Sequence, residues 1–272
     1  MNFFAALEKI LFAEDPDQKI ALFREFHEDF HYTKKYDFDH QSPIKISPLP
    51  SYHSFCQIIH PTRIRRPKDL SSTNALAKVI HSIVHIEYSA IDLALDASYR
   101  FRNLSPQYYT DWLEVAQEEI SHFLLLRSLL QDLGFDYGDF PVHQNLFDAQ
   151  MATNHSLSHR MGLVHRALEA NGLDANPFVA QKISQSSHAI AKKALSVLDI
   201  ILRDEISHVH KGDKWWRAYK KEGEDFLSLL RDYRRFSPMS KILNKEARLQ
   251  AGYTKEELLL IERDKPMEGS QY

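Results

Sequence analysis

Apolar residues recur at intervals of three and four along most of the chain, which is the spacing of one face of an α-helix. No alternating strand pattern persists anywhere, so the predicted fold class is all-α. Only 8 glycines occur among 272 residues, which favours long helices with few tight turns. The periodic stretches predict helices over about 3–28, 73–103, 106–133, 146–171, 176–210 and 213–235.

Helix boundaries are signalled by capping residues, glycines and prolines. Asp15-Pro16-Asp17 is expected to interrupt the first helix, and Ser105-Pro106 to begin the one that Gly134 ends. Gly172 is expected to end the helix that starts near 146, and Asn176-Pro177 to begin the next, which ends near Gly212. A short helix is predicted at 238–250, and the capping box Thr254-Lys255-Glu256-Glu257 opens a last one.

The stretch from about 32 to 72 lacks this periodicity and contains five prolines. It is predicted to be an extended arm that packs on the main domain through Phe55, Ile58 and Ile59. The expected organisation is an N-terminal helix and arm (1–72), a four-helix bundle (73–212) and C-terminal helices packed on the same domain (213–272).

The apolar faces of two predicted helices carry the same unusual tetrapeptide, Glu-Ile-Ser-His. Residues three apart on a helix lie on one face, so Glu119 is paired with His122 and Glu205 with His208. A carboxylate on an apolar face is costly unless it is paired, protonated or bound to a metal. A carboxylate oxygen next to a neutral imidazole nitrogen is a suitable ligand pair for a metal ion. The two pairs are therefore candidate metal ligands.

Two further carboxylates complete a known arrangement. Glu87 lies within the apolar face of the helix over 73–103, and Glu169 at the edge of the apolar face of the helix over 146–171. A four-helix carboxylate bundle takes one Glu from each of two helices and Glu-x-x-His from each of the other two, and holds two metal ions. The alternative for Glu169 is an exposed acid near a helix end. The sequence thus predicts a site for two metal ions.

The order Glu, Glu-x-x-His, Glu, Glu-x-x-His resembles the ferritin-like di-iron superfamily. More closely, the sequence of residues 60–220 is similar to that of a bacterial ferritin-like family catalogued as a domain of unknown function. The segments that carry the resemblance are His85-Ile86-Glu87 with Ala90-Ile91-Asp92-Leu93-Ala94-Leu95-Asp96, Glu118-Glu119 with His122-Phe123, Tyr137-Gly138-Asp139-Phe140-Pro141-Val142-His143, Leu168-Glu169-Ala170-Asn171-Gly172-Leu173-Asp174 and Ile201-Leu202-Arg203-Asp204-Glu205-Ile206-Ser207-His208-Val209. The resemblance implies that the two metal ions are iron, with a mixed manganese–iron pair as the alternative.

The resemblance implies an antiparallel ferritin-like bundle and the six ligands Glu87, Glu119, His122, Glu169, Glu205 and His208. It also implies that Glu118 and Asp204 orient ligand histidines by accepting their free N–H groups. His85 and His165 are candidates for supporting the ligands by hydrogen bonds as well, and the alternative for both is a histidine whose hydrogen bonds are satisfied within the helices.

The composition limits the binding partners and the cellular location that can be expected. The net charge of −3 gives no electrostatic reason to expect nucleic acid or an anionic membrane. Cys56 is the only cysteine, so intrachain disulfides and thiolate clusters are excluded. The N-terminus lacks the features of a signal peptide, and no apolar run is long enough for a membrane span, so a cytoplasmic protein is expected.

Two functions remain open. The first is an O2-dependent oxidase or hydroxylase that acts on a small molecule and takes electrons from a separate donor, because no flavin or NAD motif is present. The second is a non-catalytic metal protein in which the metal is structural or is handled as cargo. A bundle that serves only as an interaction module would be expected to lack some ligands. The sequence leaves a homodimer open.

Overall fold

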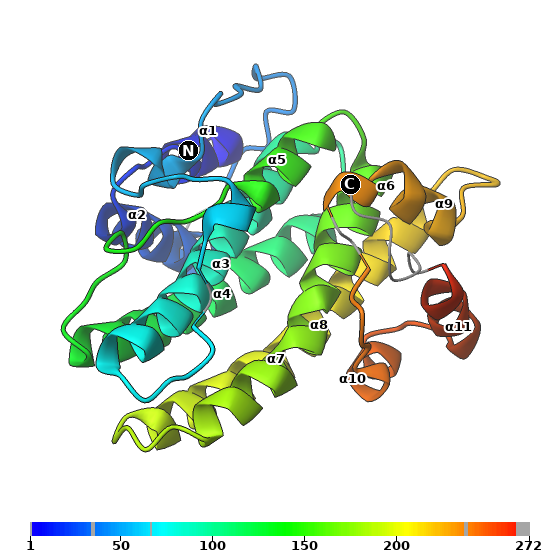
Figure 1. Cartoon of the computed structure of the whole chain (residues 1–272). Helices are drawn as coiled ribbons and strands as arrows, with labels where there is room; N and C mark the ends of the chain where they lie inside the picture. The colour runs from blue at the N-terminus through cyan, green and yellow to red at the C-terminus, as the bar shows by residue number, and fades with distance from the viewer. Residues whose placement is uncertain (1, 34–35, 66, 237–238, 265–272) are drawn as a thin grey trace. The chain divides into compact units, whose positions relative to one another are not determined.

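Helices form the regular structure of the chain, as the apolar spacing predicts (Figure 1). The structure is a computed structural model that describes residues 2–33, 36–65, 67–236 and 239–264. Within these residues, β-structure is limited to two isolated bridges, Asn2–Asp37 and Ile58–Val142. The α-helices of eight residues or more are α1 (Phe3–Leu11), α2 (Pro16–Glu28), α3 (Thr73–Arg100), α4 (Pro106–Asp132), α5 (Asn145–Ala152), α7 (Glu169–Ser184), α8 (Ala191–Tyr219) and α11 (Lys255–Arg263).

The chain divides into two compact units, and each is described by itself. The first unit comprises Met1–Asp148 and Ser186–Ala194, and the second comprises Ala149–Gln185 and Leu195–Tyr272. In the part of the chain that the structure describes, no helix is both long enough and apolar enough to cross a membrane.

The first unit is built on the packing of α3 against α4, which lie side by side (Figure 1). Ser72 caps α3 by accepting the backbone N–H of Ala75, and Pro106 occupies the first turn of α4, where its missing N–H costs nothing. Gly134 adopts a φ of +83°, and the N–H of Phe135 reaches back to the carbonyl of Leu130. Since the left-handed region favours glycine, Gly134 ends α4 as predicted.

The predicted interruption of the first helix at Asp15-Pro16 is confirmed. Asp15 accepts the N–H of Gln18 and Pro16 begins α2, so the chain turns between α1 and α2. Lys19, three residues later, is fully buried, and its ammonium group contacts Asp92 of α3 and the carbonyl of Leu11. A buried ion pair therefore joins the N-terminal helices to α3.

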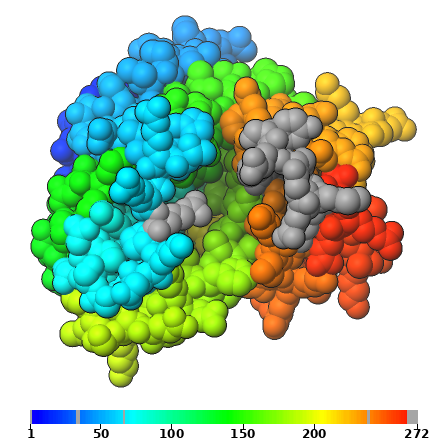
Figure 2. Space-filling view, viewed as in Figure 1, coloured from blue at the N-terminus to red at the C-terminus, as the bar shows by residue number. Residues whose placement is uncertain are grey.

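The proline-rich segment is extended as predicted, and the predicted anchors contact the rest of the unit: the Phe55 ring lies 5.4 Å from that of Tyr137, and Ile58 and Ile59 pair with Val142. Other residues of the segment are more deeply buried. Tyr52, Cys56 and Leu70 are buried, whereas Phe55, Ile58 and Ile59 are only partly covered. A single helical turn explains the difference, because the N–H of Cys56 bonds to the carbonyl of Tyr52 and places both side chains on the inner side. Residues 40–50 form a large part of the blue surface at the top of Figure 2.

The second unit departs from the predicted helix boundaries at Gly172 and Asn176-Pro177. Both lie inside α7, and the helix continues to Ser184. Pro177 cannot donate to the carbonyl of Leu173, but the Asn244 side chain donates to that carbonyl instead. Asn176 does not cap a helix, and its amide donates to the carbonyl of Leu198 in α8. The proline is tolerated because tertiary contacts replace the missing hydrogen bond.

Gly212 was also wrongly predicted to end a helix. It lies within α8, where a Cβ atom at this position would be 2.2 Å from the carbonyl oxygen of His165. The glycine thus allows a close approach between backbones. Trp215 and Trp216 consequently belong to α8, and the next helix, α9 (Phe226–Asp232), is shorter than predicted.

The C-terminal part of the second unit contains α10 (Lys245–Gln250) and α11. The helix predicted at 238–250 is therefore shorter, and residue 238 lies outside the described residues. The capping box is confirmed: the Thr254 hydroxyl accepts the N–H of Glu257, and the Glu257 carboxylate accepts that of Thr254.

Candidate metal centre

The first unit brings three of the predicted ligands together. Glu87 of α3 and Glu119 and His122 of α4 are 4%, 0% and 1% exposed. The Nδ1 atom of His122 lies 3.2 Å from a Glu87 carboxylate oxygen and 3.6 Å from one of Glu119. One ligand atom from each residue lies within 4.8 Å of the others, a spacing that a single metal ion can bridge. Two oxygens and one nitrogen therefore converge on one point in the core.

The two carboxylates of this cluster determine the protonation of its histidine. Burial disfavours a charged imidazole, but the adjacent carboxylates of Glu119 and Glu87 outweigh it and raise the pKa of His122 to about 11. In the absence of metal, a proton on His122 thus offsets part of the negative charge of the two acids. A divalent cation would take over the role of this proton, because a metal ligand must be the neutral imidazole.

The second unit contains the other Glu-x-x-His pair. Glu205 and His208 lie on the same face of α8, with the Glu205 carboxylate 3.4 Å from Nδ1 of His208. Their exposed fractions are 7% and 1%. The repeat seen in the sequence therefore corresponds to a buried carboxylate beside a buried imidazole in both units.

Glu169 and His165 are also close in the second unit, at the end of a π-helical segment, η4 (Arg160–Leu168). The His165 Nδ1 atom lies 4.0 Å from a carboxylate oxygen of Glu169, which is the first residue of α7. Glu169 was expected near the end of a helix, whereas it marks the point where a π-helix returns to an α-helix. Short π-helical stretches within helices frequently occur at functional sites.

The residues expected to support the ligands by hydrogen bonds have diverse surroundings. Glu118 is partly exposed, and Asp204 accepts a hydrogen bond from Arg203 at 2.9 Å. His85 is 3% exposed and is hydrogen-bonded through both ring nitrogens, to the hydroxyl of Tyr137 at 2.9 Å and to the carbonyl of His143 at 2.6 Å. Burial lowers the pKa of His85 to about 3, so its imidazole is neutral.

Two buried acids of α3 had no role in the sequence-based prediction. Asp92 contacts the buried ammonium group of Lys19, and Asp96 accepts a 2.6 Å hydrogen bond from Arg100, which lies one turn further along. The sequence contained a signal for both, because each interrupts an otherwise apolar stretch over residues 90–97. Lys19, the partner of Asp92, could not be identified, since it is distant in the sequence.

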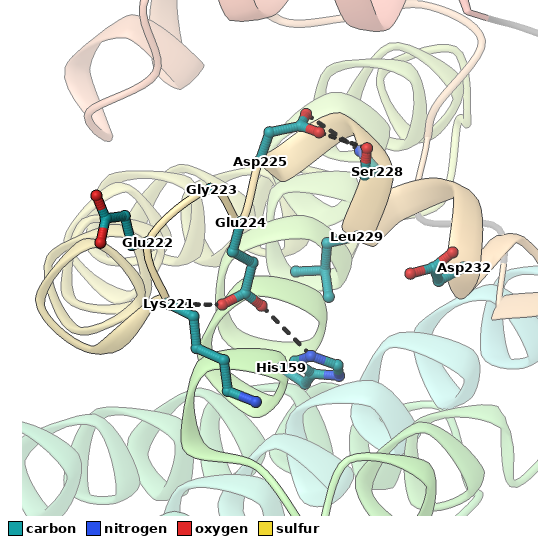
Figure 3. A pocket seen from close by; sticks show the side chains of 9 residues that line it. All are labelled: His159, Lys221, Glu222, Gly223, Glu224, Asp225, Ser228, Leu229 and Asp232. Atoms are coloured by element: carbon teal, nitrogen blue, oxygen red, sulfur yellow. Dashed lines mark hydrogen bonds and ion pairs between the residues drawn. The ribbon is translucent and has the colours of Figure 1, made fainter.

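A separate pocket of about 310 Å³ lies in the second unit (Figure 3). Figure 3 shows the Glu224 side chain directed at His159, and its carboxylate lies 3.3 Å from Nε2. Glu224 also accepts the N–H of Lys221, and Asp225 caps α9 through the N–H groups of Leu227 and Ser228. These acids thus serve the local backbone, and the predicted ligands of the second unit do not line this pocket.

Comparisons with known proteins identify the family of this chain. No solved structure matches the chain. An "Uncharacterized protein" of Haemophilus influenzae is 43% identical over 209 residues, which is 71% of this chain and 71% of that protein. Residues 12–259 match the family described as "Protein of unknown function (DUF455)". The match covers most of the sequence, and the chain therefore belongs to this family.

Proposed function

We propose that this protein is a di-metal carboxylate protein with a ferritin-like bundle over residues 73–212, flanked by the N-terminal segment and the C-terminal helices. The observation that carries the proposal is the buried convergence of Glu87, Glu119 and His122 in the first unit. Three ionisable groups in an apolar core are costly unless a counter-charge is present, and a metal ion supplies it.

The second Glu-x-x-His supports two metals rather than one. Glu205 and His208 repeat the chemistry of Glu119 and His122, and Glu169 is the counterpart of Glu87 in helix order. The proposed ligand set therefore contains four carboxylates and two imidazoles, and the order of these residues along the chain is the basis for joining them. Glu118, Asp204, His85 and His165 are proposed to support the ligands.

The donor chemistry favours iron or manganese over a thiolate-bound metal. Oxygen and imidazole ligands suit Fe(II) and Mn(II). Burial raises the pKa of the Cys56 thiol to about 12, so the only sulfur nucleophile of the chain stays protonated. Iron is the primary choice, and a manganese–iron pair is the alternative.

The proposed activity is O2-dependent oxidation or hydroxylation of a small molecule. A reduced metal pair held by these residues would supply the electrons for the reduction of O2. The protein shields the ligands from solvent: the side chains of Glu87, Glu119 and His122 are 6%, 0% and 1% exposed, so little bulk water reaches them. A separate electron donor is required for repeated turnover, since the sequence has no nucleotide-cofactor motif.

Metal binding tests this proposal directly. Metal-free protein is titrated anaerobically with Fe(II), the bound iron is counted by elemental analysis, and O2 is then admitted while the optical spectrum is recorded. Two irons per chain with new ligand-to-metal absorption on oxygenation are expected. Tightly bound metal without a spectral response to O2 would favour the structural-metal alternative, and no binding would overturn the proposal.

The ligand assignment has its own test. Glu119→Ala and His208→Ala each remove one ligand from one of the two Glu-x-x-His pairs. Each variant is expected to lose bound iron while keeping its helical circular dichroism. A stoichiometry that stays at two irons per chain in either variant would contradict the assignment of that residue.

A further inference from the structure

The loop between α4 and α5 inserts a tyrosine ring into the core of the first unit. Tyr137 is 8% exposed, and its ring centroid lies 5.1 Å from that of Tyr88 on α3 and 5.6 Å from that of Phe123 on α4. The rings of Tyr88 and Phe123 are themselves 5.2 Å apart. One ring of the loop therefore packs against both long helices at the same level.

The position of this ring along the two helices is significant. Tyr88 directly follows Glu87, and Phe123 directly follows His122. A shift of either aromatic residue would move the neighbouring ligand through the shared backbone. Tyr137 thus contacts the two residues best placed to set the separation of Glu87 and His122.

A directed hydrogen-bond chain holds Tyr137 in place. The carbonyl of His143 can only accept, so Nε2 of His85, 2.6 Å away, carries the proton. The Nδ1 atom of His85 is consequently an acceptor, and the Tyr137 hydroxyl donates to it at 2.9 Å. Both ends of this chain belong to the loop, and its centre is a side chain of α3.

The loop backbone is fixed at a second point. The N–H of Gly138 donates to Nε2 of His81, one turn before His85 on α3. Gly138 has a φ of +110°, and a Cβ atom here would lie 3.0 Å from the carbonyl oxygen of Phe55. Only glycine fits both the backbone conformation and the space. Its hydrogen bond to His81 holds the loop against α3 directly after Tyr137.

We propose that Tyr137 is a positioning residue that sets the separation of Glu87 and His122 by packing between Tyr88 and Phe123, with its hydroxyl anchored on His85. This inference rests on the proposed metal site. It gives a role to the motif Tyr137-Gly138-Asp139-Phe140-Pro141-Val142-His143, which metal ligation alone leaves without one. Residues that support a metal ligand from outside change metal affinity by on the order of tenfold to a hundredfold.

The experiment uses Co(II) as a spectroscopic probe of the full-length protein. Tyr137→Leu removes the ring, and Tyr137→Phe removes only the hydroxyl. Leu7→Ala is the matched control, because Leu7 is a fully buried residue of α1 that is not among the proposed ligands or the residues proposed to position them. Each variant is titrated with Co(II), and the affinity, the visible absorption bands and the thermal midpoint are recorded.

Tyr137→Leu is expected to weaken Co(II) binding by on the order of tenfold or more and to alter the visible bands. Tyr137→Phe is expected to show a smaller loss, and Leu7→Ala a lower thermal midpoint with unchanged affinity and bands. Wild-type affinity and bands in Tyr137→Leu would overturn the inference and leave only a packing role. If Tyr137→Leu does not fold, Tyr137→Phe decides: weaker Co(II) binding with altered bands supports the inference, and wild-type affinity and bands would overturn it. Failure of the wild-type protein to bind Co(II) would instead overturn the proposed metal site, and the inference with it.

Discussion

The Nδ1 atom of His122 lies 3.2 Å from a carboxylate oxygen of Glu87, so a residue of α3 and a residue of α4 meet inside the first unit. The substitution Glu87→Gln keeps the size of the side chain and removes its charge. We expect it to reduce bound iron and to abolish most of the metal-induced rise in thermal midpoint. In wild-type protein, a metal at 100 times its Kd stabilises the folded state by about 2.7 kcal/mol.

The control for this prediction is Glu14→Gln, which removes an exposed carboxylate from the same unit. Scanning calorimetry with and without Fe(II) under anaerobic conditions gives both midpoints. An equal metal-induced shift in Glu87→Gln and the wild-type protein would show that Glu87 is not a ligand.

The buried ion pair of Lys19 and Asp92 gives a prediction that is independent of metal. Lys19→Met leaves the Asp92 carboxylate without its cation in the core, and loss of one partner of a buried pair costs about 3–5 kcal/mol. Adding Asp92→Asn removes the uncompensated charge and is expected to recover much of this loss. Urea unfolding of the two variants measures both effects. Equal stability of the single and double variants would argue against charge as the cause.

Two glycines of the second unit are expected to respond oppositely to alanine. In Gly212→Ala the new methyl group would lie 2.2 Å from the carbonyl oxygen of His165, so the helices must move apart and stability falls by a few kcal/mol. In Gly172→Ala nothing lies within 4 Å of the new methyl group, and the residue is inside α7. There the better helix propensity of alanine raises the free energy of unfolding by about 0.5–1 kcal/mol. Denaturant unfolding of both variants checks the signs.

The lowered pKa of His81 leads us to expect that the free energy of unfolding decreases in acid. Burial lowers its pKa to about 4, against the opposing charges of Asp139 and Asp136. Between pH 6.5 and 4 the unfolded chain binds a proton that folded His81 does not, so unfolding becomes easier as the pH falls. Above pH 6.5 this group costs the folded state nothing, and the loss of stability grows to about 3 kcal/mol at most by pH 4.

His81→Gln is the informative variant, because its amide oxygen retains an acceptor for the Gly138 N–H but does not titrate. The free energy of unfolding of this variant should fall less steeply from pH 6.5 to 4, by up to about 1.4 kcal/mol per pH unit. Parallel curves for the two proteins would show that His81 is not the titrating group.

The sequence predicted the helical class because its apolar spacing is regular, and it predicted the ends of α4 and the start of α11 because their capping residues act locally. It failed at Gly172, Pro177 and Gly212. A glycine or a proline ends a helix only when no distant group compensates for it. Here the Asn244 amide replaces the hydrogen bond that Pro177 cannot make, and the close approach of the His165 carbonyl requires a glycine at 212 inside the helix. Such contacts join positions far apart in the sequence.

In the candidate site, too, local features could be predicted from the sequence and long-range contacts could not. The pairs at residues 119/122 and 205/208 are separated by one helical turn, so their proximity followed from sequence spacing alone. The approach of Glu87 to His122 depends on the packing of two helices, and the sequence indicated it only through the apolar surroundings of each residue. The bonds of His85 to Tyr137 and His143 depend on the path of a loop, which no periodicity describes.

The π-helical segment η4 has a consequence for the way this sequence can change. Each turn of a π-helix holds an extra residue compared with an α-helix, so the direction of Glu169 is set by how many residues precede it as well as by their identity. Loss of one residue from 160–168 would remove the extra residue, so the segment could wind as an ordinary α-helix while the residues after it keep their direction. Homologous chains can therefore shorten this segment by one residue and keep the register of α7.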